Sequence, residues 1–284
     1  ILKKCFKKEI FVKIGILLPY KENFSPEYPG AVSLFVYETS KKSKYKKDII
    51  VFGNTKYKKK FKLKYKNINL RKNLLSSQTK NYVSKFINLQ KKYKFSLIEV
   101  HNRPSYINQL TNKSPDSIYS LYFHNDPLSM DGSKTIEERK KLLKVCYKII
   151  FNSNWSKKRF LEGLENKFVN SNKLAVFFQS AQKGKISNVN KKKNWITFVG
   201  KLNKAKGYDI FVKSIREVLK KFPNWKVKII GDEKREKIIF NHENADLLGF
   251  LNHDEVLKIF EKTSIAVACS RWEEPLEEQV GSIC

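Results

Sequence analysis

The chain has 284 residues, of which 41% are hydrophobic, and its formal net charge is +31. This apolar content is enough to bury one or two cores, so a globally disordered chain is excluded. No apolar run approaches the ~20 residues that span a bilayer. The four cysteines lack CxxC spacing, which argues against a disulfide framework or a cysteine metal site and fits a reducing cytoplasm.

The positive charge comes almost entirely from lysine. Only seven of the 58 basic residues are arginine, the residue expected where a protein grips bases and phosphates with paired hydrogen bonds. Lys, Asn, Ile, Phe and Tyr share A/T-rich codons, so genome composition explains much of the excess. We therefore expect no nucleic-acid partner and only weak attraction to an anionic membrane surface.

Short apolar runs alternate with amphipathic segments along the chain. Apolar spacing predicts helices over 80–93 and 208–222, and a further helix opening at Gly30. Strands are predicted at 11–18, 48–53, 95–101, 117–124, 148–153, 174–178, 195–200, 225–231 and 264–270. This alternation indicates an α/β protein with parallel sheets covered on both faces, whose ligands bind at the carboxyl ends of the strands.

One polar, basic stretch, 179–194, interrupts the alternation. We place a first domain at 1–182, a linker at 183–194 and a second domain at 195–284. The second domain is short, because three strands and their helices make only half of a doubly wound domain.

Two strand ends share a pattern. "IEVHNRP" and "LYFHNDP" each close an apolar strand with His-Asn, followed within two residues by Pro, which places His101 and His124 at the rim of the first sheet. Each histidine has a structural alternative, as a hydrogen-bonded core side chain, and Asp126 beside His124 favours a functional role there.

Glycine and lysine mark two other turns. Gly30 follows the first strand and would let backbone amides approach an anion, although a turn glycine is the simpler interpretation. In "FVGKLNKAKGYDIF", Lys201 and Lys206 lie directly after a strand and just before a helix, a suitable place for a diphosphate. Glu274 follows a buried strand in "ACSRWEEPL". Its carboxylate could bind a sugar hydroxyl, or it could belong to an ordinary solvated turn.

In this order and spacing, the segments resemble the retaining, nucleotide-sugar-dependent glycosyltransferases of family 4, the glycosyl transferases group 1. The similarity is strongest in "FVGKLNKAKGYDIFVKSI" and "LLGFLNHDEVLKIFEKTSIAVACSRWEEP". It implies the GT-B fold, with two Rossmann-like, doubly wound parallel-sheet domains, the second of them incomplete here.

The resemblance also implies roles for single residues. Lys201 and Lys206 would contact the donor diphosphate, His124 and Glu274 would face the donor sugar, and Gly30 would belong to the acceptor-side loop. No metal or other cofactor is expected, because cationic side chains and helix N-termini stabilise the leaving group.

The function implied is transfer of a sugar, with retention, from a nucleotide-sugar to a glycan or lipid-linked acceptor in the synthesis of cell-surface polysaccharide or lipopolysaccharide. We expect a cytoplasmic hexosyltransferase-type enzyme, peripheral at the inner membrane face. The alternatives are a non-catalytic sugar-nucleotide-binding remnant, a nucleotide-sugar epimerase of the same fold and a basic nucleic-acid-binding protein. The donor base, the sugar and the oligomeric state are not predicted.

The ends of the chain depart from the family pattern. Ser282 stands where the family has its second glutamate, and the last eight residues, "EEQVGSIC", could arise from a slipped reading frame near Leu276. We therefore expect a truncated or frame-shifted copy that is poorly soluble and inactive. The absence of an initiator Met leads us to expect an incomplete N-terminus as well.

Overall fold

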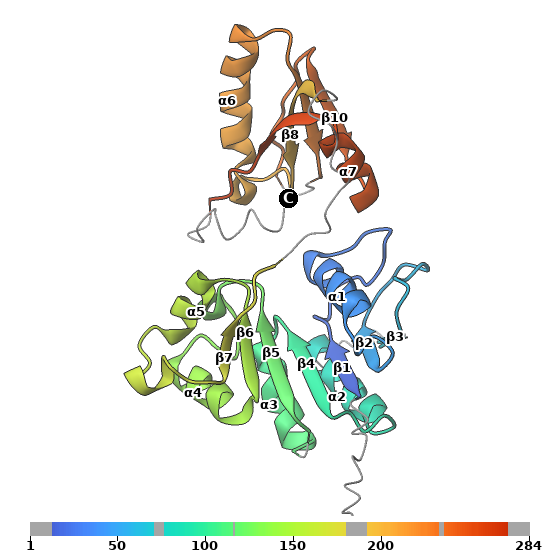
Figure 1. Ribbon diagram of the computed structural model, residues 1–284, viewed down its shortest axis with the longest axis vertical. Coiled ribbons are helices and arrows are strands. Elements are labelled where there is room, and N and C mark those ends of the chain that lie inside the picture. Colours follow the sequence, from blue (N-terminus) through green and yellow to red (C-terminus); the bar gives the residue numbers. More distant parts are fainter. Residues whose placement is uncertain (1–12, 71–76, 116, 180–191, 233–235, 272–284) are drawn as a thin grey trace, which may run out of the picture. The chain divides into compact units, whose positions relative to one another are not determined.

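The computed structural model describes residues 13–70, 77–115, 117–179, 192–232 and 236–271. The chain divides into two compact units, Ile1–Gln179 and Ser180–Cys284. Each unit is a parallel sheet with helices packed against it (Figure 1). Within the described residues, no helix is both long enough and apolar enough to cross a membrane.

The first unit contains a seven-stranded parallel sheet in the order β3-β2-β1-β4-β5-β6-β7. Its strands are β1 Ile14–Leu17, β2 Ile49–Gly53, β3 Tyr65–Asn67, β4 Leu97–His101, β5 Tyr119–Phe123, β6 Lys148–Phe151 and β7 Leu174–Val176. Its α-helices are α1 Ala31–Lys42, α2 Gln78–Gln90, α3 Pro104–Lys113, α4 Ile136–Val145 and α5 Asn154–Leu161, with short 3-10 turns η1 Pro127–Ser129 and η2 Asn166–Phe168.

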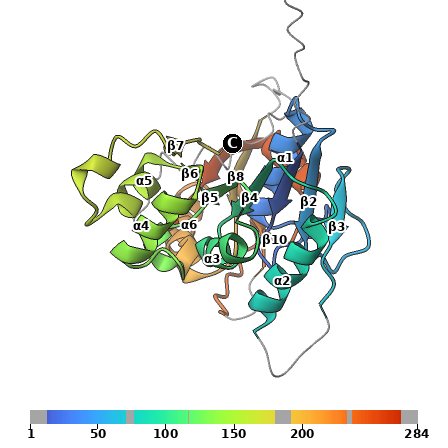
Figure 2. The ribbon, with the colours of Figure 1, turned by 90° about the horizontal axis from the view of Figure 1, so that it is seen from below.

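Helix α1 lies on one side of this sheet, and α2 and α3 lie on the other (Figure 2). A hydrophobic cluster of buried side chains lies on each face. Helix α1 packs on one face through Val32, Phe35 and Val36. The other cluster includes residues from α2, α3, α4 and α5 together with alternate strand residues. Burial on both faces explains why the strands are continuous apolar runs without polar alternation.

The strand order reverses between β1 and β4. Strand β1 pairs with β2 on one side and with β4 on the other, so the connection after β1 leaves in one direction and the connection after β4 in the other. A crevice forms at such a reversal, outside the carboxyl ends of the strands. In this unit, the segments at that crevice are the loop carrying Gly30 and the end of β4 at His101.

The second unit repeats the opening half of this arrangement. Its four parallel strands have the order β10-β9-β8-β11, with β8 Lys193–Val199, β9 Lys226–Ile230, β10 Ala245–Gly249 and β11 Thr263–Val267. Helix α6 (Tyr208–Lys221) supplies much of the core, whereas α7 (His253–Phe260) has no buried residue. Leu247 and Ile265 are 60% and 45% exposed, so apolar surface remains on this sheet. The reversal of strand order here lies between β8 and β11.

All nine predicted strands are present, and so are the predicted helices. Two short strands were not predicted, β3 and β10. Strand β3 is three residues long and carries Lys66, while Asp246 to Leu248 of β10 are exposed, so neither has a continuous apolar run. Strand β8 begins at Lys193, so the last residues of the expected linker belong to a strand; 183–191 lie outside the described residues.

Two glycines of the second unit share a left-handed backbone but differ in surroundings. Gly207 has φ +67° and a side-chain carbon there would lie 1.8 Å from the carbonyl oxygen of Cys269, whereas Gly249 has φ +66° with no heavy atom within 4 Å. We expect Gly249→Ala to cost about 1–2 kcal/mol of unfolding free energy, the cost of the left-handed backbone alone. Gly207→Ala should lower the unfolding free energy clearly more, because the added methyl group would clash with the backbone carbonyl of Cys269, which cannot move aside as a side chain can.

Urea unfolding of both variants and the parent chain, followed by circular dichroism, measures this difference. Equal losses for the two variants would contradict the close packing of Cys269 on Gly207.

Candidate functional site

The two His-Asn motifs meet at the carboxyl edge of the first sheet. His101 is the last residue of β4 and His124 directly follows β5, the neighbouring strand. The Nδ1 atom of His101 lies 2.8 Å from Nε2 of His124. Both residues are at the sheet rim, as predicted, but their side chains are buried and stack with Tyr122.

Two further residues extend this contact into a chain of hydrogen bonds. Glu99 Oε1 lies 2.6 Å from His101 Nε2, and the side-chain amide nitrogen of Gln179 lies 2.6 Å from His124 Nδ1. The amide donates to Nδ1, so the His124 proton must be on Nε2, where it is donated to His101 Nδ1. His101 in turn donates from Nε2 to the Glu99 carboxylate. One assignment of protons satisfies all three bonds, with both imidazoles neutral.

Burial fixes the charge of this group. Desolvation, and then the neighbouring His101, hold the pKa of His124 well below its ordinary value of 6.5. His124 is therefore a neutral imidazole at neutral pH. A neutral ring can hydrogen-bond a sugar hydroxyl, but it does not neutralise a phosphate.

The backbone around His124 is held by two asparagines. The His124 amide donates to Asn102 Oδ1 at 3.2 Å, and its carbonyl accepts from Asn152 Nδ2 at 3.1 Å. Asn102 has φ +53°, a left-handed conformation that asparagine tolerates better than most residues. The asparagine of the first motif thus positions the histidine of the second, which gives the repeated His-Asn pattern a structural reason.

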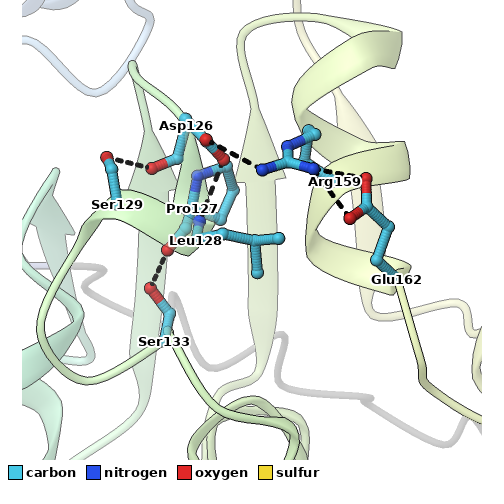
Figure 3. A network of polar contacts seen from close by, with 7 residues as sticks. All are labelled: Asp126, Pro127, Leu128, Ser129, Ser133, Arg159 and Glu162. Carbon is cyan, nitrogen blue, oxygen red and sulfur yellow. Dashed lines mark hydrogen bonds and ion pairs between the residues drawn. The ribbon is translucent and has the colours of Figure 1, made fainter.

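Asp126 lies in the turn after β5, where its side chain contacts η1 and α5 (Figure 3). Its carboxylate accepts from the Leu128 amide at 3.0 Å and lies 3.3 Å from Arg159 of α5, which also pairs with Glu162. Ser129 donates to the Asp126 carbonyl at 2.7 Å. Asp126 therefore caps η1 and ties it to α5, so its position beside His124 in the sequence does not place it in a catalytic pair.

The space beside Gly30 is filled by a carboxylate of the chain itself. Glu22 Oε1 accepts from the Ser33 amide in the first turn of α1 at 2.9 Å, and a side-chain carbon on Gly30 would lie 2.0 Å from Glu22 Oε1. Burial raises the pKa of Glu22, against the opposing effect of the Ser33 hydrogen bonds. Gly30 does open a helix, as predicted, and the anion at that helix N-terminus is Glu22.

In the second unit, the loop after β8 carries both predicted lysines. Lys201 and Lys206 are exposed, and the first residue of α6 follows at Tyr208. Asn203 accepts from the Lys206 amide at 3.0 Å and caps the short turn η4 (Lys204–Lys206). The loop with Lys201 and Lys206, and the N-terminus of α6 that follows it, therefore lie at the end of β8, where the strand order reverses between β8 and β11.

The loops after β8 and β9 make close backbone contacts at the carboxyl edge of the second sheet. A side-chain carbon on Gly231, after β9, would lie 1.8 Å from the carbonyl oxygen of Gly200, after β8. The loops after these two strands therefore touch main chain to main chain, which only glycine allows at Gly231.

Arg271 connects the segment after β11 to the loop after β8, residues 200–207, which we call the lysine loop. Its guanidinium lies 2.7 Å from the Asp209 carboxylate in the first turn of α6, and its amide donates to the Ala205 carbonyl at 3.1 Å. Desolvation acts to raise the pKa of Asp209, but the Arg271 hydrogen bond and charge prevail and lower it. The loops after β8 and β11 thus meet around this ion pair.

Glu274, the predicted sugar-binding carboxylate, lies outside the described residues, as does Ser282. Among the residues that the structure describes, no group of three or more His, Cys, Asp or Glu side chains could hold a metal ion. Independence of metal stays a prediction.

Sequence reasoning missed four residues at these sites. Glu99 and Gln179 complete the histidine hydrogen-bond chain, Glu22 occupies the Gly30 turn, and Arg271 pairs with Asp209. Glu99 carried the clearest signal, because it is a charged residue two positions from His101 in an otherwise apolar strand. Gln179 and Glu22 lie in loops, which have no hydrophobic periodicity that could mark them.

Residues 179–282 match the family model described as Glycosyl transferases group 1. Spore coat protein SA of Bacillus subtilis (strain 168) is 24% identical over 217 residues, which are 66% of this chain and 56% of that protein. The chain thus spans little more than half the length of this curated relative. The resemblance read from the sequence is confirmed by these matches.

Solved structures match the fold. The complex of Anabaena HepE with UDP and glucose has a TM-score of 0.64 and 14% identity, covering 93% of this chain and 76% of that one. The UDP-GlcNAc 2-epimerase of Neisseria meningitidis bound to UDP-GlcNAc has a TM-score of 0.55 and 13% identity, covering 90% and 77%. The GT-B fold expected from the sequence is confirmed.

The low pKa of His124 predicts a particular pH dependence of stability. In the unfolded chain this histidine takes up a proton near pH 6.5, whereas in the folded chain it does so only at much lower pH. Stability contributed by the neutral ring is therefore fully present above pH 6.5 and is lost as the pH falls below it. We expect His124→Gln to flatten the fall in unfolding free energy between pH 7 and 5, by up to about 1.4 kcal/mol per pH unit.

Urea titrations at several pH values in this range measure the slope. His253→Gln, in the other unit, is the matched control and should lack this flattening. A parent slope that is unchanged in His124→Gln would show that the ring titrates normally.

Proposed function

We propose that this chain, a GT-B protein whose second unit carries the group 1 glycosyl transferase segment, derives from enzymes that move a sugar from a nucleotide-sugar to an acceptor. The observation that carries the proposal is the loop after β8. It brings Lys201, Lys206 and the N-terminus of α6 to the strand reversal of the second sheet. Anionic diphosphates bind at such positions in doubly wound sheets.

The two units offer complementary chemistry. The second unit is cationic at its strand reversal, which suits the leaving nucleoside diphosphate, since its negative charge grows as the bond to the sugar breaks. The first unit offers a buried, neutral histidine whose tautomer is fixed by Glu99 and His101. Both ring nitrogens of His124 are hydrogen-bonded within this unit, so we assign it a contact with the donor sugar in which a sugar hydroxyl would donate to Nδ1 in place of the Gln179 amide.

We propose retention of the anomeric configuration, with the acceptor hydroxyl attacking from the face that the diphosphate leaves. Lys201 and Lys206 hold the diphosphate, and we assign Glu274 a contact with the donor sugar. We also propose that the transferred sugar is a hexose and that the acceptor is a glycan or a lipid-linked molecule. The reaction would take place in the cytoplasm and serve the synthesis of cell-surface polysaccharide or lipopolysaccharide. No metal is required in this scheme, because the cations are supplied by side chains.

A second candidate is supported by the comparisons. The fold of the UDP-GlcNAc 2-epimerase of Neisseria meningitidis is also similar to this chain, so the fold alone does not separate transfer from epimerisation. Binding of the nucleotide-sugar without turnover is the third outcome. Analysis of the products from a labelled nucleotide-sugar distinguishes the three: a glycosylated acceptor, an epimer, or unchanged donor.

The diphosphate role predicts a selective loss of nucleotide affinity. We expect Lys201→Ala and Lys206→Ala each to weaken binding of UDP by about tenfold or more, as loss of a hydrogen bond to a charged group does. Lys213→Ala is the matched control, because Lys213 is an exposed lysine further along α6, and its affinity should stay within about twofold of the parent.

Isothermal titration of UDP, GDP and ADP in the presence of EDTA measures these affinities and tests metal independence in the same experiment. Equal affinities for all three variants and the parent chain would reject the lysine loop as the diphosphate site.

A further inference from the structure

The segment 41–66 concentrates positive charge far beyond the rest of the chain. It holds twelve lysines, one acidic residue, Asp48, and no arginine. It runs from the end of α1 through β2 to β3, the outermost strand of the first sheet (Figure 1). We call these residues the lysine edge: Lys41, Lys42, Lys44, Lys46, Lys47, Lys56, Lys58, Lys59, Lys60, Lys62, Lys64 and Lys66.

Side chains along the last part of this segment alternate between core and solvent. Phe61, Leu63 and Tyr65 pack against the cluster under α1, whereas Lys62, Lys64 and Lys66 are exposed. The ring of Phe61 stacks on Tyr37 with centroids 4.3 Å apart, and Tyr65 stacks on Phe24 at 5.1 Å. The buried rings therefore anchor the segment and hold its lysines outward.

The charges of the lysine edge are scarcely compensated. Within the described part of the chain, Lys41 with Glu38 is the one ion pair that involves it. By contrast, the opposite end of the sheet, around α4 and α5, carries a set of ion pairs: Lys140 with Glu137 and Glu165, Lys167 with Glu165, and Arg159 with Glu162. The first unit is therefore electrically polarised from one sheet edge to the other, which codon bias alone would not produce.

We infer that the lysine edge docks on an anionic lipid membrane. Each lysine close to such a surface strengthens membrane binding by roughly fivefold, and its ammonium group needs no fixed position relative to the lipid headgroups. Nucleic acid is the less suitable partner, because the segment lacks arginine for base contacts and the rings of Phe61 and Tyr65 face the core, where they cannot stack on bases.

Contacts tie the lysine edge to the loop that carries Gly30. Tyr28, 37% exposed, stacks on Tyr57 of the edge with ring centroids 6.2 Å apart, and the Lys59 amide donates to Glu27 at 3.3 Å. Docking would hold the loop after β1 near the lipid surface. On the proposed function this loop lies on the acceptor side, so a lipid-linked acceptor fits; the docking itself does not depend on sugar transfer.

Sedimentation of the full chain with lipid vesicles tests the inference. We expect binding to vesicles of phosphatidylcholine with about a third phosphatidylglycerol, and little binding to phosphatidylcholine alone. The variant Lys58→Gln, Lys59→Gln, Lys62→Gln, Lys66→Gln should lower the partition coefficient by about tenfold or more. The matched control, Lys113→Gln, Lys141→Gln, Lys144→Gln, Lys158→Gln, removes the same charge from exposed lysines elsewhere in the first unit and should lower it less than threefold.

Circular dichroism of both variants checks that they fold. An equal loss of vesicle binding in the two variants would show that the net charge of the chain, and not the lysine edge, drives binding. That result would overturn the inference. Absence of binding by the parent chain, or preferential binding to a DNA duplex over anionic vesicles at the same salt concentration, would also overturn it. UDP titration of the same variants reports on the proposed function separately, because these lysines lie in the first unit.

Discussion

The reversal of strand order in each sheet is the constraint on which both candidate sites depend. In a parallel sheet, every strand ends at the same edge, and at a reversal the two neighbouring connections leave in opposite directions. The loops after β1 and β4 separate in this way in the first unit, and those after β8 and β11 in the second. Polar residues at these points therefore lie at the carboxyl edge of each sheet, beyond the apolar runs that form its core.

The polar groups at the two reversals of strand order differ for local physical reasons. In the first unit, packing under Phe35 and Tyr122 buries the His101–His124 pair, so desolvation keeps His124 neutral and Glu99 sets the direction of the hydrogen bonds. In the second unit, Lys201 and Lys206 are exposed to solvent in the loop that leads to the N-terminus of α6. The polar group of the first unit is therefore neutral and buried, whereas that of the second unit is exposed.

Much of the fold was predictable from periodicity, because strands buried on both faces read as apolar runs and helices as amphipathic stripes. The edge strands β3 and β10 were not predicted, because β3 has only three residues and because Asp246, Leu247 and Leu248 of β10 are exposed. Site residues followed a similar rule. The positions of Lys201, His101 and His124 at strand ends were predictable because each lies at the end of an apolar run, whereas their functional roles stay predictions. Glu22 and Gln179 act through contacts across the fold, which no sequence spacing encodes, and Asp126 proved to be a capping residue.

The central claim is that a nucleoside diphosphate binds at the reversal between β8 and β11. Hydrogen–deuterium exchange of the full chain with and without UDP tests it most directly, because amides in the loop and first turn of α6 would be held by the phosphates. We expect UDP-dependent protection in 200–211, with exchange in the segment 41–66 unchanged. Protection confined to the first unit, or none at a saturating UDP concentration, would contradict it.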